Sequence, residues 1–183
     1  MINYILSFML FSVVIEQEEK NYEYLDKQIE LSVSNIKEEY EAFLKNSFNG
    51  EDKEIIIKKI NRYLNSNLKG KGRFIVEYSL KVGVDPYLVT AVMLQETGCY
   101  WKCSYLARVC NNVGGNKGKP SCNNGSYREF DTLDDGIKFA INKLNKYYKK
   151  GYKTPKQINK YYATDKTWYK KVDNYIKKLK KDL

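Results

Sequence analysis

The chain has 183 residues, of which 43% are hydrophobic, so it can form one domain of ordinary size with a packed core and an additional extension. Its formal net charge is +10, but residues 1–70 carry 9 Lys+Arg against 12 Asp+Glu, which leaves 23 against 10 for residues 71–183. Because the sequence contains no histidine, histidine-based catalytic triads, histidine metal sites and imidazole proton relays are excluded.

The N-terminal segment, residues 1–15, contains an apolar run from Tyr4 to Ile15 that ends at Glu16. The run is shorter than the roughly 20 residues that a membrane-spanning helix needs. It has the character of the apolar core of a signal peptide, although no Lys or Arg precedes it and no Ala-x-Ala site follows it. A start codon assigned too late would explain both the short length of the run and the missing basic residues before it. We therefore predict export by an N-terminal signal, with an uncleaved membrane anchor or a buried helix as alternatives.

Residues 16–70 are predicted to form a helical extension. Apolar residues recur at helical spacing, at Leu25, Ile29, Val33, Ile36, Tyr40 and Phe43. Asn49-Gly50 interrupts this pattern, and a second amphipathic stretch follows with Ile55, Ile56, Ile60 and Leu64. Gly70-Lys71-Gly72 has the composition of a linker. The extension could be a spacer, a helix pair packed on the main domain, or a short coiled coil.

Residues 86–97 are predicted to form a short helix that carries a catalytic candidate. Asp85 is its expected N-cap, Pro86 occupies the first helical position and Gly98 ends it. Leu88, Ala91, Val92 and Gln95 recur at helical spacing and form a mainly apolar stripe along it. Glu96 continues this stripe, and a carboxyl group on an apolar face is desolvated, which raises its pKa. A general acid needs such a pKa near neutral pH. The alternative is a helix-end glutamate that faces solvent or pairs with a lysine.

Four cysteines lie close together, at Cys99, Cys103, Cys110 and Cys122. In an exported domain an even, clustered set predicts two disulfides, and four cysteines allow three connectivities. A zinc site fits less well, because the spacing lacks a close cysteine pair on both sides. Reduced thiols are the third alternative. We expect no metal and no cofactor.

The C-terminal segments are also predicted to be helical. One helix starts at Thr132, with Asp135 in a capping-box-like position, and ends near Gly151. A shorter helix opens at Thr154-Pro155, and Asp165 is the expected cap of the last helix. Only residues 125–130 have strand character, as one arm of a small hairpin. The predicted fold class is therefore mainly α.

An ordered set of motifs covers roughly residues 72–180. It consists of Glu96-Thr-Gly98, Ser104-Tyr-Leu-Ala107, Asn111-Asn-Val-Gly-Gly-Asn-Lys-Gly118, Tyr127-Arg-Glu-Phe-Asp-Thr-Leu-Asp-Asp-Gly-Ile137 and Tyr162-Ala-Thr-Asp165. The set resembles the peptidoglycan-cleaving glucosaminidases (mannosyl-glycoprotein endo-β-N-acetylglucosaminidase-like) of the lysozyme-like superfamily. Gly83-Val-Asp-Pro86 is similar to the entry of the same helix in lytic transglycosylases. The resemblance implies a lysozyme-like catalytic domain over residues 71–183 that cleaves a β-1,4 glycosidic bond of the bacterial cell-wall glycan.

The resemblance also implies the site. Glu96 would be the general acid, and the substrate-binding residues would be Asn112, Gly114, Gly115 and Tyr162. The two glycines would let a sugar approach the main chain, or they form a plain turn, and Tyr162 could instead be a core aromatic.

Glycoside hydrolysis ordinarily uses two carboxylates, and the lobe where the family carries the second one, residues 119–126, contains no Asp or Glu. Glu129 and Asp131 flank this gap but occupy positions that look structural. With Glu96 alone, the site could act as a lytic transglycosylase or through the substrate's own N-acetyl group. A muramidase acting on the same glycan is a further alternative.

The basic C-terminal half suits an anionic polymer. Nucleic acid is the competing partner, since 17 tyrosines could stack on bases. However, the sequence contains no nucleic-acid-binding signature. We therefore predict peptidoglycan glycan strands as the partner, a secreted or cell-surface location, and no nucleic acid. Membrane attachment would use the N-terminal apolar segment. Two non-enzymatic alternatives are an inactive wall-binding module and a structural subunit of a secretion or conjugation apparatus.

Overall fold

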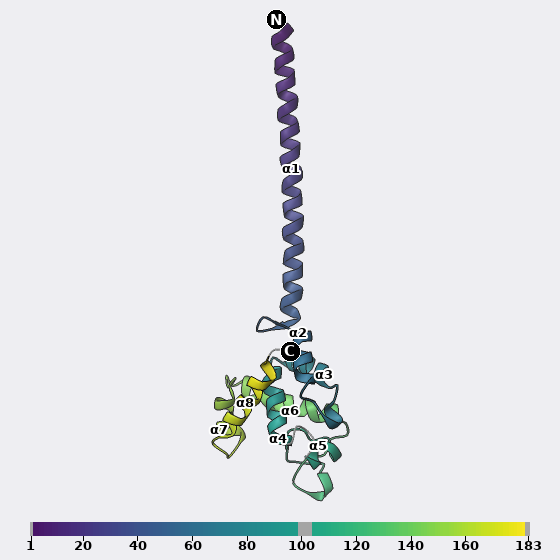
Figure 1. The fold of residues 1–183 in the computed structure, drawn as a ribbon, viewed down its shortest axis with the longest axis vertical. Coiled ribbons are helices and arrows are strands. Elements are labelled where there is room, and N and C mark those ends of the chain that lie inside the picture. The colour runs from purple at the N-terminus through teal and green to yellow at the C-terminus, as the bar shows by residue number, and fades with distance from the viewer. Residues whose placement is uncertain (1, 99–103, 182–183) are drawn as a thin grey trace. The chain divides into compact units, whose positions relative to one another are not determined.

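The computed structural model describes residues 2–98 and 104–181, and it consists mainly of α-helices, as predicted (Figure 1). The chain divides into two units, Met1–Ser47 and Phe48–Leu183.

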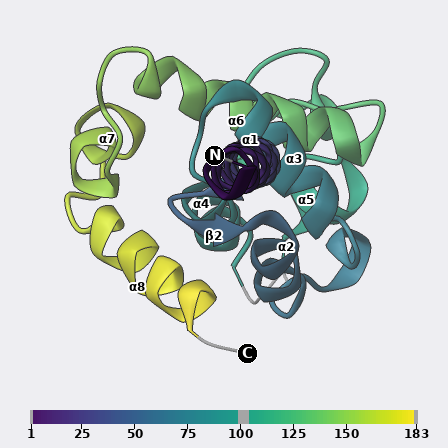
Figure 2. The ribbon, with the colours of Figure 1, turned by 90° about the horizontal axis from the view of Figure 1, so that it is seen from above.

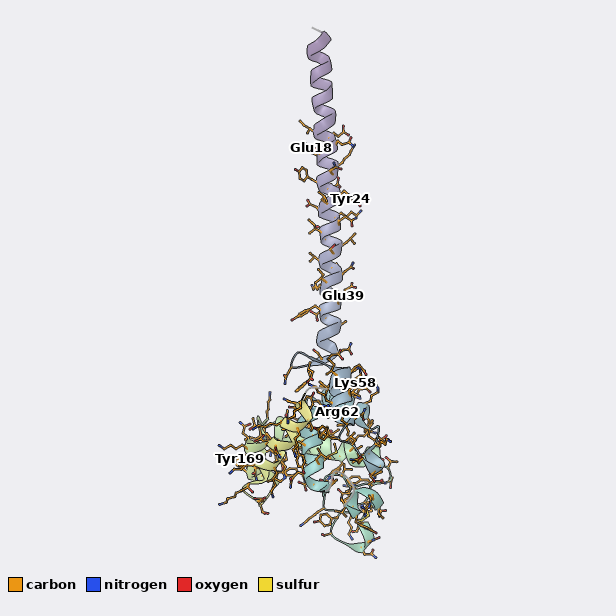
Figure 3. The ribbon with its side chains drawn as sticks, in the orientation of Figure 1. Glu18, Tyr24, Glu39, Lys58, Arg62 and Tyr169 are labelled. Carbon is orange, nitrogen blue, oxygen red and sulfur yellow. A yellow bond between two sulfur atoms is a disulfide. The ribbon has the colours of Figure 1, made fainter. Side chains whose placement is uncertain are left out.

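The first unit is built on one helix, α1 (Ile2–Lys45), which runs without a break past the expected end of the apolar segment at residue 15. Its side chains are exposed from residue 15 to residue 42. Glu18, Tyr24 and Glu39 mark successive positions along it in Figure 3. Within the described ranges, no helix combines the length and the apolarity needed to cross a membrane.

A short hairpin follows α1, formed by β1 (Ser47–Phe48) and β2 (Glu51–Asp52). Asn49 and Gly50 connect the strands with φ angles of 52° and 79°. A two-residue hairpin turn of type I′ requires positive φ at both positions, and Asn-Gly is the preferred pair. The sequence predicted only an interruption here, because strands of two residues are too short to show an alternating pattern.

Helices make up most of the second unit. They are α2 (Lys53–Asn61), α3 (Gly72–Val82), α4 (Pro86–Thr97), α5 (Tyr105–Val109), α6 (Leu133–Tyr148), α7 (Pro155–Tyr162) and α8 (Trp168–Lys180). Short 3-10 turns lie at Ser66–Leu68 and Cys122–Asn124.

The second unit begins at Phe48, whereas the sequence placed the start of the catalytic domain at residue 71. The reason is that α2 contributes Ile56, Ile57 and Ile60 to the same buried core as the later helices. The expected linker is a tight connection, since the Gly72 N–H donates to Asn61 Oδ1 at 3.0 Å.

Helix α4 lies at the centre of the second unit, in contact with α3, α6 and α8 (Figure 2). Every residue from Pro86 to Leu94 is buried. The predicted ends are confirmed: the Asp85 carboxylate accepts hydrogen bonds from the backbone N–H groups of Tyr87 and Leu88, and Gly98 follows the last residue of the helix. A helix that is apolar on all sides is buried on all sides, so α4 forms a rigid base for Glu96 in its last turn.

The C-terminal half follows the predicted order, with one difference. Thr132 caps α6, and Thr154 with Gln157 forms a capping box on α7. The last helix, however, has Thr167 at its N-cap position, and Asp165 acts two residues earlier by accepting the Thr167 N–H at 2.8 Å. The predicted hairpin arm is present only as isolated bridges, Lys117 to Tyr127 and Ser121 to Arg128.

Candidate functional site

Glu96 lies in the last turn of α4, where burial raises the pKa of its carboxyl group. Two weaker influences oppose this shift, a hydrogen bond and the positive charge of Lys143. The hydrogen bond comes from Trp168, whose Nε1–H donates to Glu96 Oε1 at 3.2 Å. Trp168 is the first residue of α8, and the packing of α8 on α4 brings its buried indole to the carboxyl group. The raised pKa predicted from the apolar setting of Glu96 is therefore present.

The loop after α5 faces the other oxygen of Glu96. Gly115 has a φ of +56°, and a Cβ atom at this position would lie 3.1 Å from Glu96 Oε2. Glycine thus serves two purposes here, since it accepts the left-handed backbone conformation and leaves room beside the carboxyl group. The sequence predicted that a sugar would approach the main chain closely at Gly115. In the structure the group beside Gly115 is the carboxyl group of Glu96.

Asn112 and Gly114 lie beneath this loop and not on its surface. Asn112 is 1% exposed, and its side chain donates to the carbonyls of Asn116 and Arg128 and accepts the Asn116 N–H. Gly114 is buried, and a Cβ there would lie 3.2 Å from the Ala140 Cβ. Both residues are packed within the loop, and the contact with substrate expected from the sequence stays a prediction.

Tyr162 lies in the same cluster as Glu96. Its ring packs on Trp168 at 4.8 Å between centroids, and Lys143 Nζ lies 4.4 Å from its ring centroid. Burial and the nearby charge of Glu96 raise the pKa of Tyr162. Lys143 Nζ also donates to Asn116 Oδ1 at 3.2 Å, and burial lowers the pKa of Lys143. Aromatic rings and one cation thus surround the carboxyl group.

Two cavities share Tyr162 as a common wall. One of about 530 Å³ is lined by Gly115, Asn116, Lys117, Phe139, Asn142, Lys143, Lys146 and Tyr162. The other, of about 660 Å³, is lined by Lys156, Asn159, Lys160, Tyr161, Tyr162, Ala163, Thr164, Lys166 and Tyr169 (Tyr169 is labelled in Figure 3). Aromatic faces and lysines dominate both linings, which suits a sugar polymer that carries negative groups.

Three other carboxylates near this cluster in the sequence are exposed to solvent. Glu129 and Asp131 are exposed, and neither affects the pKa of Glu96. Asp165 binds Thr167 and Lys171, and these hydrogen bonds lower its pKa to about 2. In the described part of the chain, no group of three or more His, Cys, Asp or Glu side chains could hold a metal ion.

One of the predicted disulfides is present. Cys110 and Cys122 are bonded, with their Cα atoms 5.7 Å apart. The bridge ties the end of α5 to the arm that pairs with residues 127–128, and so closes the segment that contains Gly115. Cys99 and Cys103 lie outside the described residues, so a second bridge stays a prediction.

Sequence reasoning missed three members of the cluster, Trp168, Lys143 and Asn116. Trp168 is the first residue of the last helix, and a buried indole N–H usually needs an acceptor, so this need was the available signal. Lys143 follows the apolar residue Ile141 by two positions on α6, and nothing in its local pattern separates it from the many exposed lysines.

Comparison with known proteins identifies the family of the chain. A family model described as mannosyl-glycoprotein endo-beta-N-acetylglucosaminidase (Glucosaminidase) matches residues 72–181, which include Glu96, Gly115 and Tyr162. No curated protein matches the chain. The family match supports a glycosidase that acts on peptidoglycan. The match covers more than half of the sequence, and the chain therefore belongs to the glucosaminidase family.

Proposed function

We propose that this protein cleaves a β-1,4 glycosidic bond of the bacterial cell-wall glycan as an endo-β-N-acetylglucosaminidase, with Glu96 as the general acid. One observation carries the proposal. The carboxyl group of Glu96 is desolvated at the end of a largely buried helix, and this burial raises its pKa, which favours the protonated form that a general acid uses.

The geometry suggests which oxygen carries the proton. Trp168 donates to Oε1, so Oε1 must act as an acceptor. The proton then resides on Oε2, the oxygen that faces Gly115. In the first step Glu96 Oε2–H protonates the glycosidic oxygen, the bond from this oxygen to the anomeric carbon breaks, and the leaving sugar departs with the new hydroxyl group. The electron-poor anomeric carbon that remains must be attacked by a nucleophile.

The second step distinguishes two outcomes. In hydrolysis, water attacks the anomeric carbon and loses its proton to a base. In lytic transglycosylation, a hydroxyl group of the same sugar attacks, and Glu96 takes back the proton, which gives an anhydro product. Glu129, Asp131 and Asp165 are exposed, and none of them is among the groups that shift the pKa of Glu96, which favours a site with one carboxylate. Lytic transglycosylation, or assistance by the N-acetyl group, is therefore the second candidate mechanism.

The two cavities beside Tyr162 supply surfaces for the glycan. Tyr161, Tyr162 and Tyr169 can pack on sugar rings, and Lys156, Lys160 and Lys166 can attract the carboxylates of the peptide stems. The Cys110–Cys122 disulfide and a substrate outside the cell both indicate an extracellular location, reached by the export signal predicted at residues 1–15.

The test is incubation of the purified protein with peptidoglycan, followed by mass spectrometry of the released fragments. Glu96→Gln should reduce release by about 10²–10⁴-fold, because the amide keeps the shape but cannot donate a proton. Glu129→Gln is the matched control and should stay within about tenfold of the wild type. N-acetylglucosamine at the new reducing end would support hydrolysis by a glucosaminidase, and anhydro ends would support transglycosylation.

Two results would contradict the proposal. Lysis retained by Glu96→Gln would remove Glu96 from the chemistry. Wild-type protein that sediments with peptidoglycan but releases no fragment would indicate a wall-binding module.

A further inference from the structure

The exposed face of α1 carries a repeat that the catalytic chemistry does not use. Tyr22, Leu25 and Ile29 are followed eleven residues later by Val33, Ile36 and Tyr40. All six side chains are more than half exposed. An eleven-residue period corresponds to about 3.67 residues per turn, close to the 3.6 of a straight helix. These six residues, the apolar seam, therefore stay on one narrow face along the whole helix.

We propose that α1 associates with α1 of a second copy of this chain as a parallel, two-stranded coiled coil through the apolar seam. An eleven-residue repeat gives a right-handed supercoil. The seam and Leu44, which follows Val33 by the same interval, extend over about three heptads, the length from which a coiled coil can be argued. One repeat earlier, Phe11 and Val14 precede Tyr22 and Leu25, whereas Glu18 precedes Ile29 and interrupts the apolar row there.

The flanks of the seam determine the direction of pairing. At helical spacing, one flank carries mainly acidic residues, Glu19, Glu23, Asp26, Glu30 and Glu41, together with Lys37. The other flank carries mostly uncharged polar residues, Gln17, Asn21, Gln28, Ser32 and Asn35, together with Glu39. In a parallel pair each flank faces the opposite flank of the partner, whereas in an antiparallel pair like flanks meet. Parallel pairing thus avoids placing one acidic row against another.

The same charges argue against a lipid surface as the occupant of the seam. Residues 16–45 contain nine Asp and Glu and four Lys. Helices that lie on anionic membranes carry Lys and Arg on their polar face. The acidic balance also argues against binding of the seam helix to the anionic wall, and leaves a second copy as the partner that fits.

The first test is the mass of the full chain in solution, measured by light scattering during size-exclusion chromatography over a wide range of concentration. The wild type should have twice the mass of the 21.5 kDa chain. Ile29→Glu with Ile36→Glu places charges in the seam and should give a monomer in which the second unit still unfolds in one cooperative transition. Leu31→Glu, an exposed apolar position on the opposite face, is the matched control and should stay dimeric.

The second test is the direction of pairing. Under oxidation, Tyr22→Cys and Tyr40→Cys should each form cross-linked dimers with themselves, beyond the wild-type background from native cysteines. In an antiparallel pair only a mixture of the two variants would cross-link, which would overturn the parallel arrangement. A monomeric wild type, a trimer, or a monomer that sediments with phospholipid vesicles would overturn the proposal as a whole. None of these outcomes depends on glycan cleavage, so a failure here is distinct from a failure of the proposed function.

Discussion

Glu96 is held in an environment that favours its neutral form, which gives the folded state a dependence on pH. Its pKa in the folded protein is raised above the ordinary value of 4.5. Below pH 4.5 the group is protonated in both states and carries no penalty. As the pH rises through the folded pKa, Glu96 ionises readily in the unfolded chain, whereas in the folded chain its charge is buried. The free energy of unfolding therefore falls.

We therefore expect Glu96→Gln to be more stable than the wild type at pH 7 and about equally stable at pH 4. Glutamine has the same shape, can still accept from Trp168 Nε1–H, and never ionises. Thermal unfolding followed by circular dichroism at both pH values measures this difference. An equal shift in melting temperature at both pH values would mean that packing, not ionisation, is responsible.

Lys143 should control the pH range in which the acid works. Its positive charge lowers the pKa of Glu96, so Lys143→Met should raise this pKa and move the alkaline fall of glycan cleavage to higher pH. Since the protein has no histidine, no imidazole titrates in the same range. Lys146→Met, an exposed lysine of the same cavity, is the control. An unchanged pH profile of cleavage by the Lys143→Met variant would show that Lys143 does not influence the pKa of Glu96.

At the residue scale, the sequence predicted Glu96, its raised pKa and its closeness to Gly115 and Tyr162 through local pattern and family motifs. It could not predict the Trp168 or Lys143 contacts. Trp168 lies 72 positions after Glu96, and Lys143 lies 27 positions after Asn116. Only the packing of α8 and α6 on α4 brings these residues together.

At the scale of elements, Gly136 fixes the distance between α6 and the loop that begins at Asn111. A Cβ at this position would lie 1.8 Å from the backbone oxygen of Asn111, a group that cannot move aside cheaply. Gly136→Ala should therefore destabilise the protein by at least about 2 kcal/mol, in the upper part of the usual cost of overpacking. Elsewhere in an exposed helix the same change would stabilise by about 1 kcal/mol.

Urea unfolding of Gly136→Ala measures this cost, and Lys146→Ala on the exposed face of α6 is its control. An unchanged or raised midpoint would show that α6 can shift away from the loop. The sequence predicted the helix but not the contact between Gly136 and the Asn111 backbone. A glycine near the start of a helix does not by itself indicate that another segment packs against it.

The Cys110–Cys122 bridge should contribute about 2–4 kcal/mol, the usual value for a disulfide that closes a loop of this length. Cys110→Ser with Cys122→Ser should lower the melting temperature, and added reductant should lower that of the wild type by a similar amount. If reductant lowers the wild-type value much further than the double substitution does, a second bridge between Cys99 and Cys103 is indicated. A melting temperature that is unchanged in both experiments would contradict a stabilising role.

At the scale of the whole molecule, the position of α2 predicts where the chain can be shortened. A chain of residues 48–183 keeps the whole buried core of the described residues and should unfold in one cooperative transition. A chain of residues 71–183 loses Ile56, Ile57 and Ile60, whose removal exposes the faces of α3 and α8 that they cover, and should fail to fold. Circular dichroism melts of the two chains decide this, and a stable 71–183 chain would support the boundary predicted from the sequence.

The amphipathic pattern of residues 55–64 was visible in the sequence, but a helix in an extension and a helix of the core have the same periodicity. The periodicity of apolar residues does not show which surface covers the apolar face of the helix. For α2 this surface is the rest of the second unit, whereas the side chains of α1 from residue 15 to residue 42 are exposed.

The Cys110–Cys122 bridge also links the shape of the acid site to the compartment in which the protein resides. Thiols stay reduced in the cytosol and pair after export. If the protein is exported as proposed, a newly made chain lacks the tie that closes the segment carrying Gly115 against Glu96 until it has left the cytosol. Under the proposed function, oxidation would then be a maturation step that completes the acid site in the compartment of its substrate.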